Sequence, residues 1–385
     1  MTKARINLSA ITLFLTLFLT GCWDIKSIED LTIPIASGYE IVNGPDSGVK
    51  LMNVYTVYPV FYKNAPRKSV VDVIQSGYIG ETRTMRQEHI GGKLNLGGIQ
   101  VAVIGRELAQ EGIRNALNII LRTAQLKSTI AIAMAEGNIN DIFYAVPDNY
   151  PNVGIYMKTL LADAYKQSFI LKSDLHHVSV AMDTPGWHPV IPMLKAEGNE
   201  IMINGYGIFR EDKLAHTITI TEARVLNILS GMKNIGERTF PITCNGNIPC
   251  TATVKMQNEA KIKVARNGES YRIDVSVKSK GTLDDLVPNV NYHTIDNALS
   301  DKENLLKNER IEEIGKGYEE LLKKEAEALI DKAQNEFKMD IFNWIKYAQA
   351  KWRKDIDRIN WDDCFSGMDI SVNIKATIEY IGEET

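Results

Sequence analysis

Histidine side chains are the first candidates for metal binding or acid–base catalysis in this chain. None of the six belongs to the His-Glu-x-x-His pattern that binds catalytic zinc. Adjacent His176 and His177 would point to opposite faces of a strand, so we interpret them as a solvated loop pair rather than a metal site. The sequence therefore predicts no metal site. The histidines are His89, His176, His177, His188, His216 and His293.

Motifs for nucleophilic catalysis and nucleotide binding are also missing. The chain contains neither a Gly-x-Ser-x-Gly elbow nor a Walker A loop. Gly205-Tyr206-Gly207 has two glycines of a dinucleotide fingerprint, but Arg210 stands at the third position, and glycines in a strand more often mark a close backbone approach. The acidic pairs Asp284-Asp285 and Asp362-Asp363 suit helix caps or turns. We therefore expect a protein that is not an enzyme and binds no cofactor.

Cys22 has the sequence context of a lipid attachment site. Lys3 and Arg5 precede twelve uncharged residues, Leu8–Leu19, a run that fits a signal peptide but is too short to span a bilayer. The order Leu19-Thr20-Gly21-Cys22 resembles the bacterial lipobox, whose small residues give a peptidase access to the bond before the cysteine. A plain signal peptide or a short N-terminal anchor is the alternative. We predict that residues 1–21 are removed and that Cys22 carries an S-diacylglycerol group and an N-acyl chain such as palmitate.

The remaining cysteines allow one disulfide. Cys244 and Cys250 flank Asn245-Gly246 and Pro249, a turn-forming stretch that could bring the two sulfurs together outside the cytoplasm. The alternatives are that both stay reduced or, less favourably, that they bind a metal. We interpret Cys364 as a buried, unreactive thiol.

Composition indicates an ordinary globular protein tied to a membrane surface. Of 385 residues, 44% are hydrophobic and 24% charged, which argues against a disordered chain. Without Lys3 and Arg5 the formal net charge changes from −4 to −6, and no block of like charge suggests nucleic-acid binding. A polytopic membrane protein is excluded because only one long apolar run occurs.

Hydrophobic periodicity predicts strands and helices in both halves. Leu31–Val42 and Val49–Val60 read as a hairpin, and a helix is expected from about Glu107. Asn267-Gly268 predicts a second hairpin, followed by a long amphipathic helix over Lys302–Lys338. Further expected elements are the strands 99–104, 129–134, 201–210 and 213–220, the helices 151–170 and 221–229, and an alternating last strand over 368–380.

These elements predict a multi-domain α+β fold with mixed and antiparallel sheets and packed helices. The proline- and glycine-rich stretch before residue 200 suggests the main boundary there. We expect four parts: a signal peptide (1–21), a lipidated tether (22–30), an N-terminal α/β region (31–200) that could form two small domains, and a C-terminal α+β domain (201–385).

Several segments stand in an order and spacing that point to one known family: Cys22–Asp24, Ile28–Leu31, Val103–Ile113, Gly205–Phe209, Lys213-Leu214, Asp340, Trp344, Trp352 and Val372–Ile374. Together they resemble the spore germination Ger(x)C lipoproteins. The resemblance runs from Cys22 to Gly382 and implies three α/β domains. It also implies a non-enzymatic C subunit of a nutrient germinant receptor, which works with A- and B-type integral membrane subunits in the spore inner membrane.

Two other classes of protein compete with this one. A solute-binding lipoprotein of a transporter would show two doubly wound lobes around a deep cleft. A lipid-anchored hydrolase would need a nucleophile beside a base. The β hairpins and the long helix favour the germination protein over the first, and the absence of catalytic motifs disfavours the second.

Overall fold

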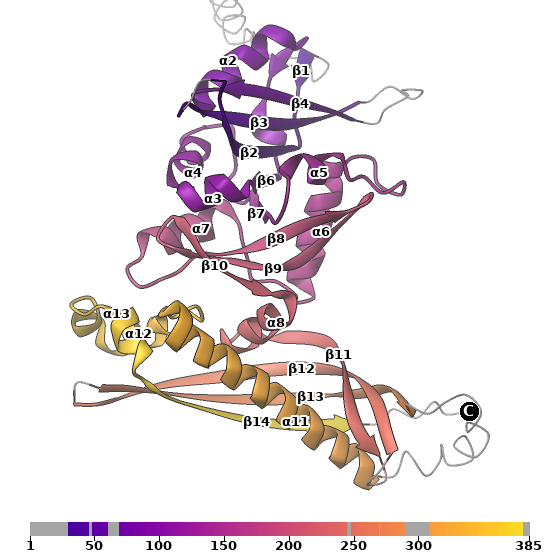
Figure 1. Ribbon diagram of the computed structural model, residues 1–385, viewed down its shortest axis with the longest axis vertical. Coiled ribbons are helices and arrows are strands. Elements are labelled where there is room, and N and C mark those ends of the chain that lie inside the picture. Colours follow the sequence, from indigo (N-terminus) through magenta and orange to yellow (C-terminus); the bar gives the residue numbers. More distant parts are fainter. Residues whose placement is uncertain are drawn as a thin grey trace, which may run out of the picture.

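The described part of the chain is built around three β-sheets that follow one another along the long axis of the molecule (Figure 1). The computed structural model describes residues 30–45, 48–60, 69–244, 248–268, 270–288 and 308–379. A small parallel pair, β1 (Leu31–Thr32) and β5 (Lys93–Leu94), lies at the N-terminal end. A sheet of eight strands occupies the middle, and a sheet of four long strands forms the opposite end.

The eight-stranded sheet has a parallel centre and antiparallel edges. Its order is β10-β9-β8-β7-β6-β2-β3-β4, with parallel pairing from β8 through β7 and β6 to β2. All four residues of β6 are buried, as expected for a central parallel strand covered on both faces. The strands are β2 (Ala36–Asn43), β3 (Lys50–Pro59), β4 (Ser69–Ser76), β6 (Val101–Ile104), β7 (Ala131–Ala135), β8 (Val190–Glu197), β9 (Glu200–Arg210) and β10 (Lys213–Thr219).

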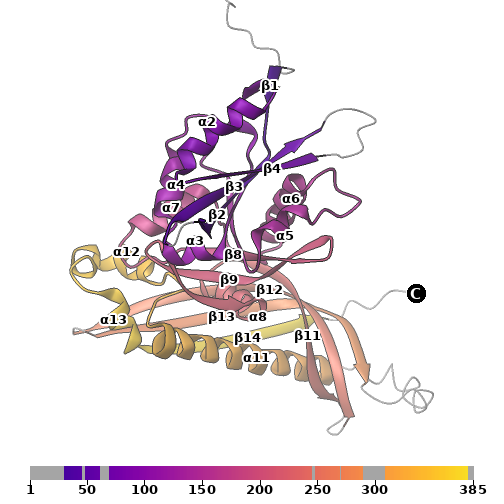
Figure 2. The same cartoon turned by 45° about the horizontal axis from the view of Figure 1, so that its top comes forward.

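Helices cover both faces of this sheet because alternate strand residues feed two separate cores. Val101 and Val103 pack with α5 (Ile139–Tyr144) and α6 (Val153–Lys166) on one face. Ala102 and Ile104 pack on the other face with three helices (Figure 2). Those helices are α3 (Arg106–Glu111), α4 (Arg114–Leu121) and α7 (Leu175–Asp183), with α2 (Ile79–His89) and a 3-10 turn, η2 (Leu96–Gly98), beside them.

The C-terminal sheet has one covered face and one exposed face. Its order is β11-β12-β13-β14, and β14 pairs parallel with β13. Along β12 the even-numbered residues from Cys250 to Val264 are buried or partly buried, whereas Lys255, Lys261 and Lys263 face outward. The strands are β11 (Asn234–Cys244), β12 (Ile248–Asn267), β13 (Ser270–Pro288) and β14 (Asp369–Glu379).

Among the described residues, one long helix and three shorter ones complete this end. The helix α11 (Asn308–Asp331) continues as a π-helical turn, η4 (Lys332–Phe337), and runs along the sheet beside β14 (Figures 1 and 2). Its stripe, which includes Ile314, Tyr318 and Leu322, is buried. The shorter helices are α8 (Ile220–Leu229), α12 (Ile345–Ile356) and α13 (Trp361–Ser366).

The predicted fold class is confirmed. The mixed and antiparallel sheets, the packed helices and the long amphipathic helix near the C-terminus are all present. The hairpin predicted at Asn267-Gly268 joins β12 to β13, with Asn267 paired opposite Ser270. Gly205 has a φ of +129°, and a Cβ there would lie 2.0 Å from the carbonyl oxygen of Ile218, so the glycine does mark a close backbone approach.

Three local interpretations were wrong. His176 and His177 lie in α7, which begins at the N-cap Asp174, and not in a loop or strand. The single helix expected from Glu107 is two helices, because Gly112 takes a φ of +134° between them. Asp284 and Asp285 lie within β13 and not in a turn or helix cap. At this point the register of β13 against β12 shifts by one residue.

The middle sheet continues across residue 200, where the sequence suggested a boundary. Strands β8 and β9 form a tight antiparallel hairpin with Glu197 opposite Glu200. The two faces of β9 also pack into the same cores as β6 and β7. The division of the chain into domains at residue 200 stays a prediction.

Candidate functional site

The proposed lipid site precedes the described chain. Cys22 and the signal peptide lie outside the described residues, which begin at Asp30. Among the residues that are described, no helix is both long and apolar enough to cross a membrane. Lipidation of Cys22 therefore remains a prediction.

The other cysteines differ from one another in state. Cys250 is buried and disulfide-bonded. Cys364 is a free thiol on α13 that is only partly buried, not buried as predicted, and this burial, with a smaller effect of Asp363, raises its pKa. In the β11–β12 register, Ile242 faces Cys250 and Cys244 faces Ile248, so the two cysteines occupy diagonal positions on one face of the hairpin. Because the side chain of Cys244 is not among those described, its pairing with Cys250 stays a prediction.

Mass mapping of the unreduced protein tests this pairing. We expect one peptide pair linked through Cys244 and Cys250, and a single alkylatable thiol at Cys364. Closing so small a loop should add roughly 2–2.5 kcal/mol to the free energy of unfolding by the chain-entropy estimate. Cys364→Ser is the matched control and should leave the linked pair intact. Alkylation of Cys244 in unreduced protein would contradict the prediction.

A buried polar cluster joins the middle sheet to the C-terminal helices. We call it the junction; its members are His188, Asp340, Asn343, Trp361 and Asp362. His188 follows α7, and its Nε2 lies 3.0 Å from both carboxylate oxygens of Asp362 in α13. The Asn343 side chain accepts the backbone N–H of His188 at 3.3 Å, and Asp362 accepts that of Asp340 at 3.2 Å. These bonds fix the C-terminal helices against the loop before β8.

Asp340 is the most deeply buried member, with no exposed surface. Its Oδ2 accepts the indole N–H of Trp361 at 2.9 Å and the backbone N–H of Ile345 at 2.8 Å. Its Oδ1 accepts the backbone N–H of Phe342 at 3.2 Å. Burial raises the pKa of this carboxyl, and the hydrogen bonds from Trp361 and Ile345 oppose the rise.

Further hydrogen bonds join β9 and α8 to the C-terminal helical segments. Arg210 in β9 donates to the carbonyl of Phe337 at 3.0 Å, and the indole of Trp344 donates to that of Leu229 at 2.8 Å. Beside the junction lies a cavity of about 520 Å³ whose lining includes Trp187, Gln349 and Trp361. In its lining, Arg114 pairs with Asp183 at 2.6 Å.

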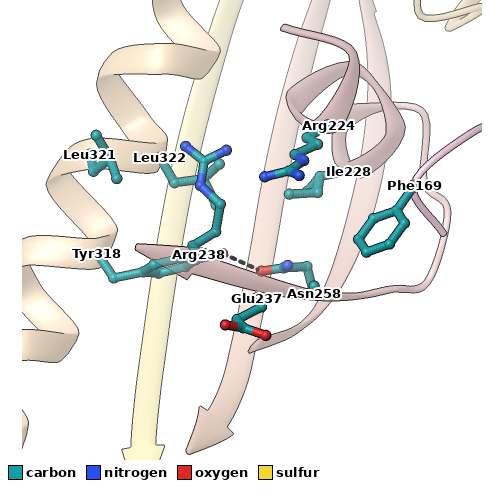
Figure 3. A pocket seen from close by; sticks show the side chains of 10 residues that line it. Phe169, Arg224, Ile228, Glu237, Arg238, Asn258, Tyr318, Leu321 and Leu322 are labelled. Carbon is teal, nitrogen blue, oxygen red and sulfur yellow. Dashed lines mark hydrogen bonds between the residues drawn. The ribbon is translucent and has the colours of Figure 1, made fainter. Parts of the chain in front are cut away.

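A second cavity lies between α8, α11 and β11 (Figure 3). Its volume is only about 20 Å³, which is on the scale of one water molecule. Tyr318 donates to Asn258 at 3.1 Å across it, and the guanidinium of Arg224 lies over the ring of Phe169. We interpret this space as a packing gap between α11 and the sheet.

The histidines and acids of the described residues do not assemble into a metal centre. Within the described part of the chain, no group of three or more His, Cys, Asp and Glu side chains could hold a metal ion. His177 Nδ1 lies 2.6 Å from Asp174, the N-cap of its own helix. His216 stacks on Phe337, and burial lowers its pKa. The junction is thus the main polar constellation, and it holds two parts of the fold together.

Sequence reasoning missed the junction because its members lie far apart in the chain. His188 and Asp362 are separated by 174 residues. Asp340, Trp344 and Trp352 were noted only as part of the family resemblance. Nothing in their local patterns indicates a buried carboxylate, since each stands next to residues of mixed polarity.

The fold and the junction define a multi-domain α+β protein whose middle sheet is joined to the C-terminal helices by polar contacts. Residues 24–196 match the family model of the spore germination protein N-terminal domain. Residues 204–382 match the model described as spore germination B3/GerAC like, C-terminal. These two models together span nearly the whole chain, which therefore belongs to the Ger(x)C family of spore germination proteins.

Individual relatives are similar to this chain over most of their own length. Spore germination protein B3 of Bacillus subtilis (strain 168) is 24% identical over 393 residues, with 97% of each chain covered. Spore germination protein GerQC of Bacillus cereus is 20% identical, with 72% of this chain and 76% of that protein covered. The crystal structure of the GerBC protein matches with a TM-score of 0.56 at 18% identity over 92% of this chain and 99% of that one, which shows a common fold.

Proposed function

We propose that this chain is the lipid-anchored C subunit of a nutrient germinant receptor in the spore inner membrane. It acts there, without catalysing a reaction, beside A- and B-type integral membrane subunits. The observation that carries the proposal is the match to both germination domains, in order, over nearly the full chain. The 97% coverage of the B3 relative supports the same assignment.

The anchor and the fold suggest how the subunit stands on the membrane. Residues 23–30 can span at most ~28 Å when fully extended, so β1 and β5 would lie close to the lipid surface. The C-terminal sheet occupies the other end of the long axis (Figure 1). Two acyl chains anchor stably where one is marginal, because each buried CH₂ contributes ~0.8 kcal/mol.

A solute-binding lipoprotein remains the runner-up, and the fold gives it no support. Such proteins have two doubly wound lobes of repeated βα units with a cleft between them. Here the middle sheet is mixed, and the second large sheet is a long meander in which only β14 runs parallel to its neighbour.

Mass spectrometry of the mature N-terminus tests the anchoring step. We expect the first residue to be Cys22 carrying a diacylglyceryl group, and the protein to sediment with membranes. Cys22→Ala should leave the precursor uncleaved and without lipid, because the thioether needs the thiol. Cys364→Ala is the matched control. An unmodified Cys22, or cleavage at another bond, would contradict the proposal.

A further inference from the structure

A third cavity, of about 460 Å³, lies at the amino ends of β6 and β7, and we call it the basic-rimmed cavity. Its apolar lining includes Ile130, Leu161 and Ile170, and its rim carries Lys127, Lys158 and Lys172. The volume falls within the roughly 300–1,000 Å³ typical of small-molecule sites, which are mainly apolar with a few polar groups.

The apolar walls come from both faces of the middle sheet. Leu161 on α6 and Ile170 belong to one hydrophobic core, and Ile99 and Ile130 belong to the other. The cavity therefore opens at the end of the sheet where β6 and β7 begin and where the two cores meet. An apolar group bound there would pack against side chains of both cores.

The rim has an excess of positive charge. Lys127 and Lys158 make no ion pair with any described residue, and Lys172 lies 3.4 Å from Asp174. The Asp174 carboxylate also contacts His177. Burial raises the pKa of Asp174, but the hydrogen bonds from His177 and the charge of Lys172 outweigh this effect and lower it. The cavity beside the junction differs, since its Arg114 and Arg210 are held by protein acceptors.

One buried polar atom in the lining also lacks a partner. The side-chain oxygen of Gln100, the residue before β6, is buried and accepts no hydrogen bond from the described residues. Such groups are rare because an unsatisfied buried acceptor costs about 1–3 kcal/mol. A water molecule held in the cavity would donate to it.

We propose that the basic-rimmed cavity binds a small anion with an apolar body, such as an aliphatic carboxylate. The carboxylate would lie against Lys127 and Lys158, and the apolar body would cover Ile130, Leu161 and Ile170. This inference goes beyond the proposed receptor role and does not depend on it, because it concerns binding to the isolated chain.

Calorimetric titration of the full chain in uncharged phosphatidylcholine nanodiscs tests the chemistry, with empty nanodiscs as the blank. The probes are hexanoate, hexanamide, acetate and inorganic phosphate. We expect hexanoate to bind at least about tenfold more tightly than either hexanamide or acetate, because charge-assisted contacts and apolar burial both contribute. Failure of hexanoate to bind, or equal binding of any other probe, overturns the proposal; equal phosphate binding would mean an adventitious ion only.

Two variants locate the binding. The double variant Lys127→Glu/Lys158→Glu reverses the rim charge, and Ala162→Phe fills the cavity without changing charge. Each should weaken hexanoate binding at least about tenfold. Lys278→Glu/Lys375→Glu, on the exposed face of the C-terminal sheet, makes the same charge change elsewhere and should have no effect. An equal loss in this control, or unchanged binding in Ala162→Phe, would overturn the proposal; thermal unfolding checks that each variant folds.

Discussion

Replacing Asp340 with alanine is expected to lower the free energy of unfolding by roughly 3–5 kcal/mol. The carboxylate accepts three N–H groups, from Trp361, Ile345 and Phe342, in a site without exposed surface. Alanine would leave these buried donors without an acceptor and open a cavity at the junction. Chemical denaturation of the purified chain measures the change.

The matched control for this variant is Asp363→Ala, which removes an exposed carboxylate from α13. Its effect should stay below about 1 kcal/mol, since only a favourable interaction with the helix N-terminus is lost. Asp340→Asn should lie between the two, because the amide keeps one acceptor but places a donor against other donors. If Asp340→Ala and Asp363→Ala were equally mild, the junction would not be a structural centre.

The raised pKa of Asp340 adds a pH dependence with a defined sign. Burial makes the folded state hold this proton to a higher pH than the unfolded state does. The stability that Asp340 contributes relative to alanine is therefore complete below pH about 4 and decreases as pH rises through the folded-state pKa. The difference in unfolding free energy between the two proteins, measured at several pH values, should follow this slope.

Local patterns were sufficient to predict most elements and the fold class. The alternation in β14, the Asn267-Gly268 turn and the apolar stripe that includes Ile314, Tyr318 and Leu322 each depend on residues a few positions apart. The break at Gly112 and the helix at His176 were missed, because backbone conformation and packing overrode the local pattern there.

The sites could not be predicted in the same way. In the junction, His188 contacts Asp362, which is far away in the sequence. In the basic-rimmed cavity, Lys127, Lys158 and Lys172 come together at the amino ends of β6 and β7. Both depend on strand order, which the sequence does not show. The cavity also lies at the amino ends of parallel strands, whereas ligands of open α/β sheets usually bind at the carboxyl ends.

Deleting the gene for this protein is expected to abolish germination with one class of nutrient while leaving growth unchanged. The two germination domains cover nearly the full chain, and a receptor that lacks one subunit should lose its response entirely. A gene copy that encodes Cys22→Ala should restore germination poorly, because the subunit would lack its anchor. Cys364→Ala is the matched control and should restore it fully.

The most direct test of the account is the germination of deletion spores on single nutrients. Release of spore-core solutes is followed over time for wild-type spores, deletion spores and deletion spores that carry the intact gene. We expect no release from deletion spores with one nutrient class, a normal release with the others, and recovery with the intact gene. A normal response to every nutrient, in spores that carry no second receptor set of this type, would contradict it.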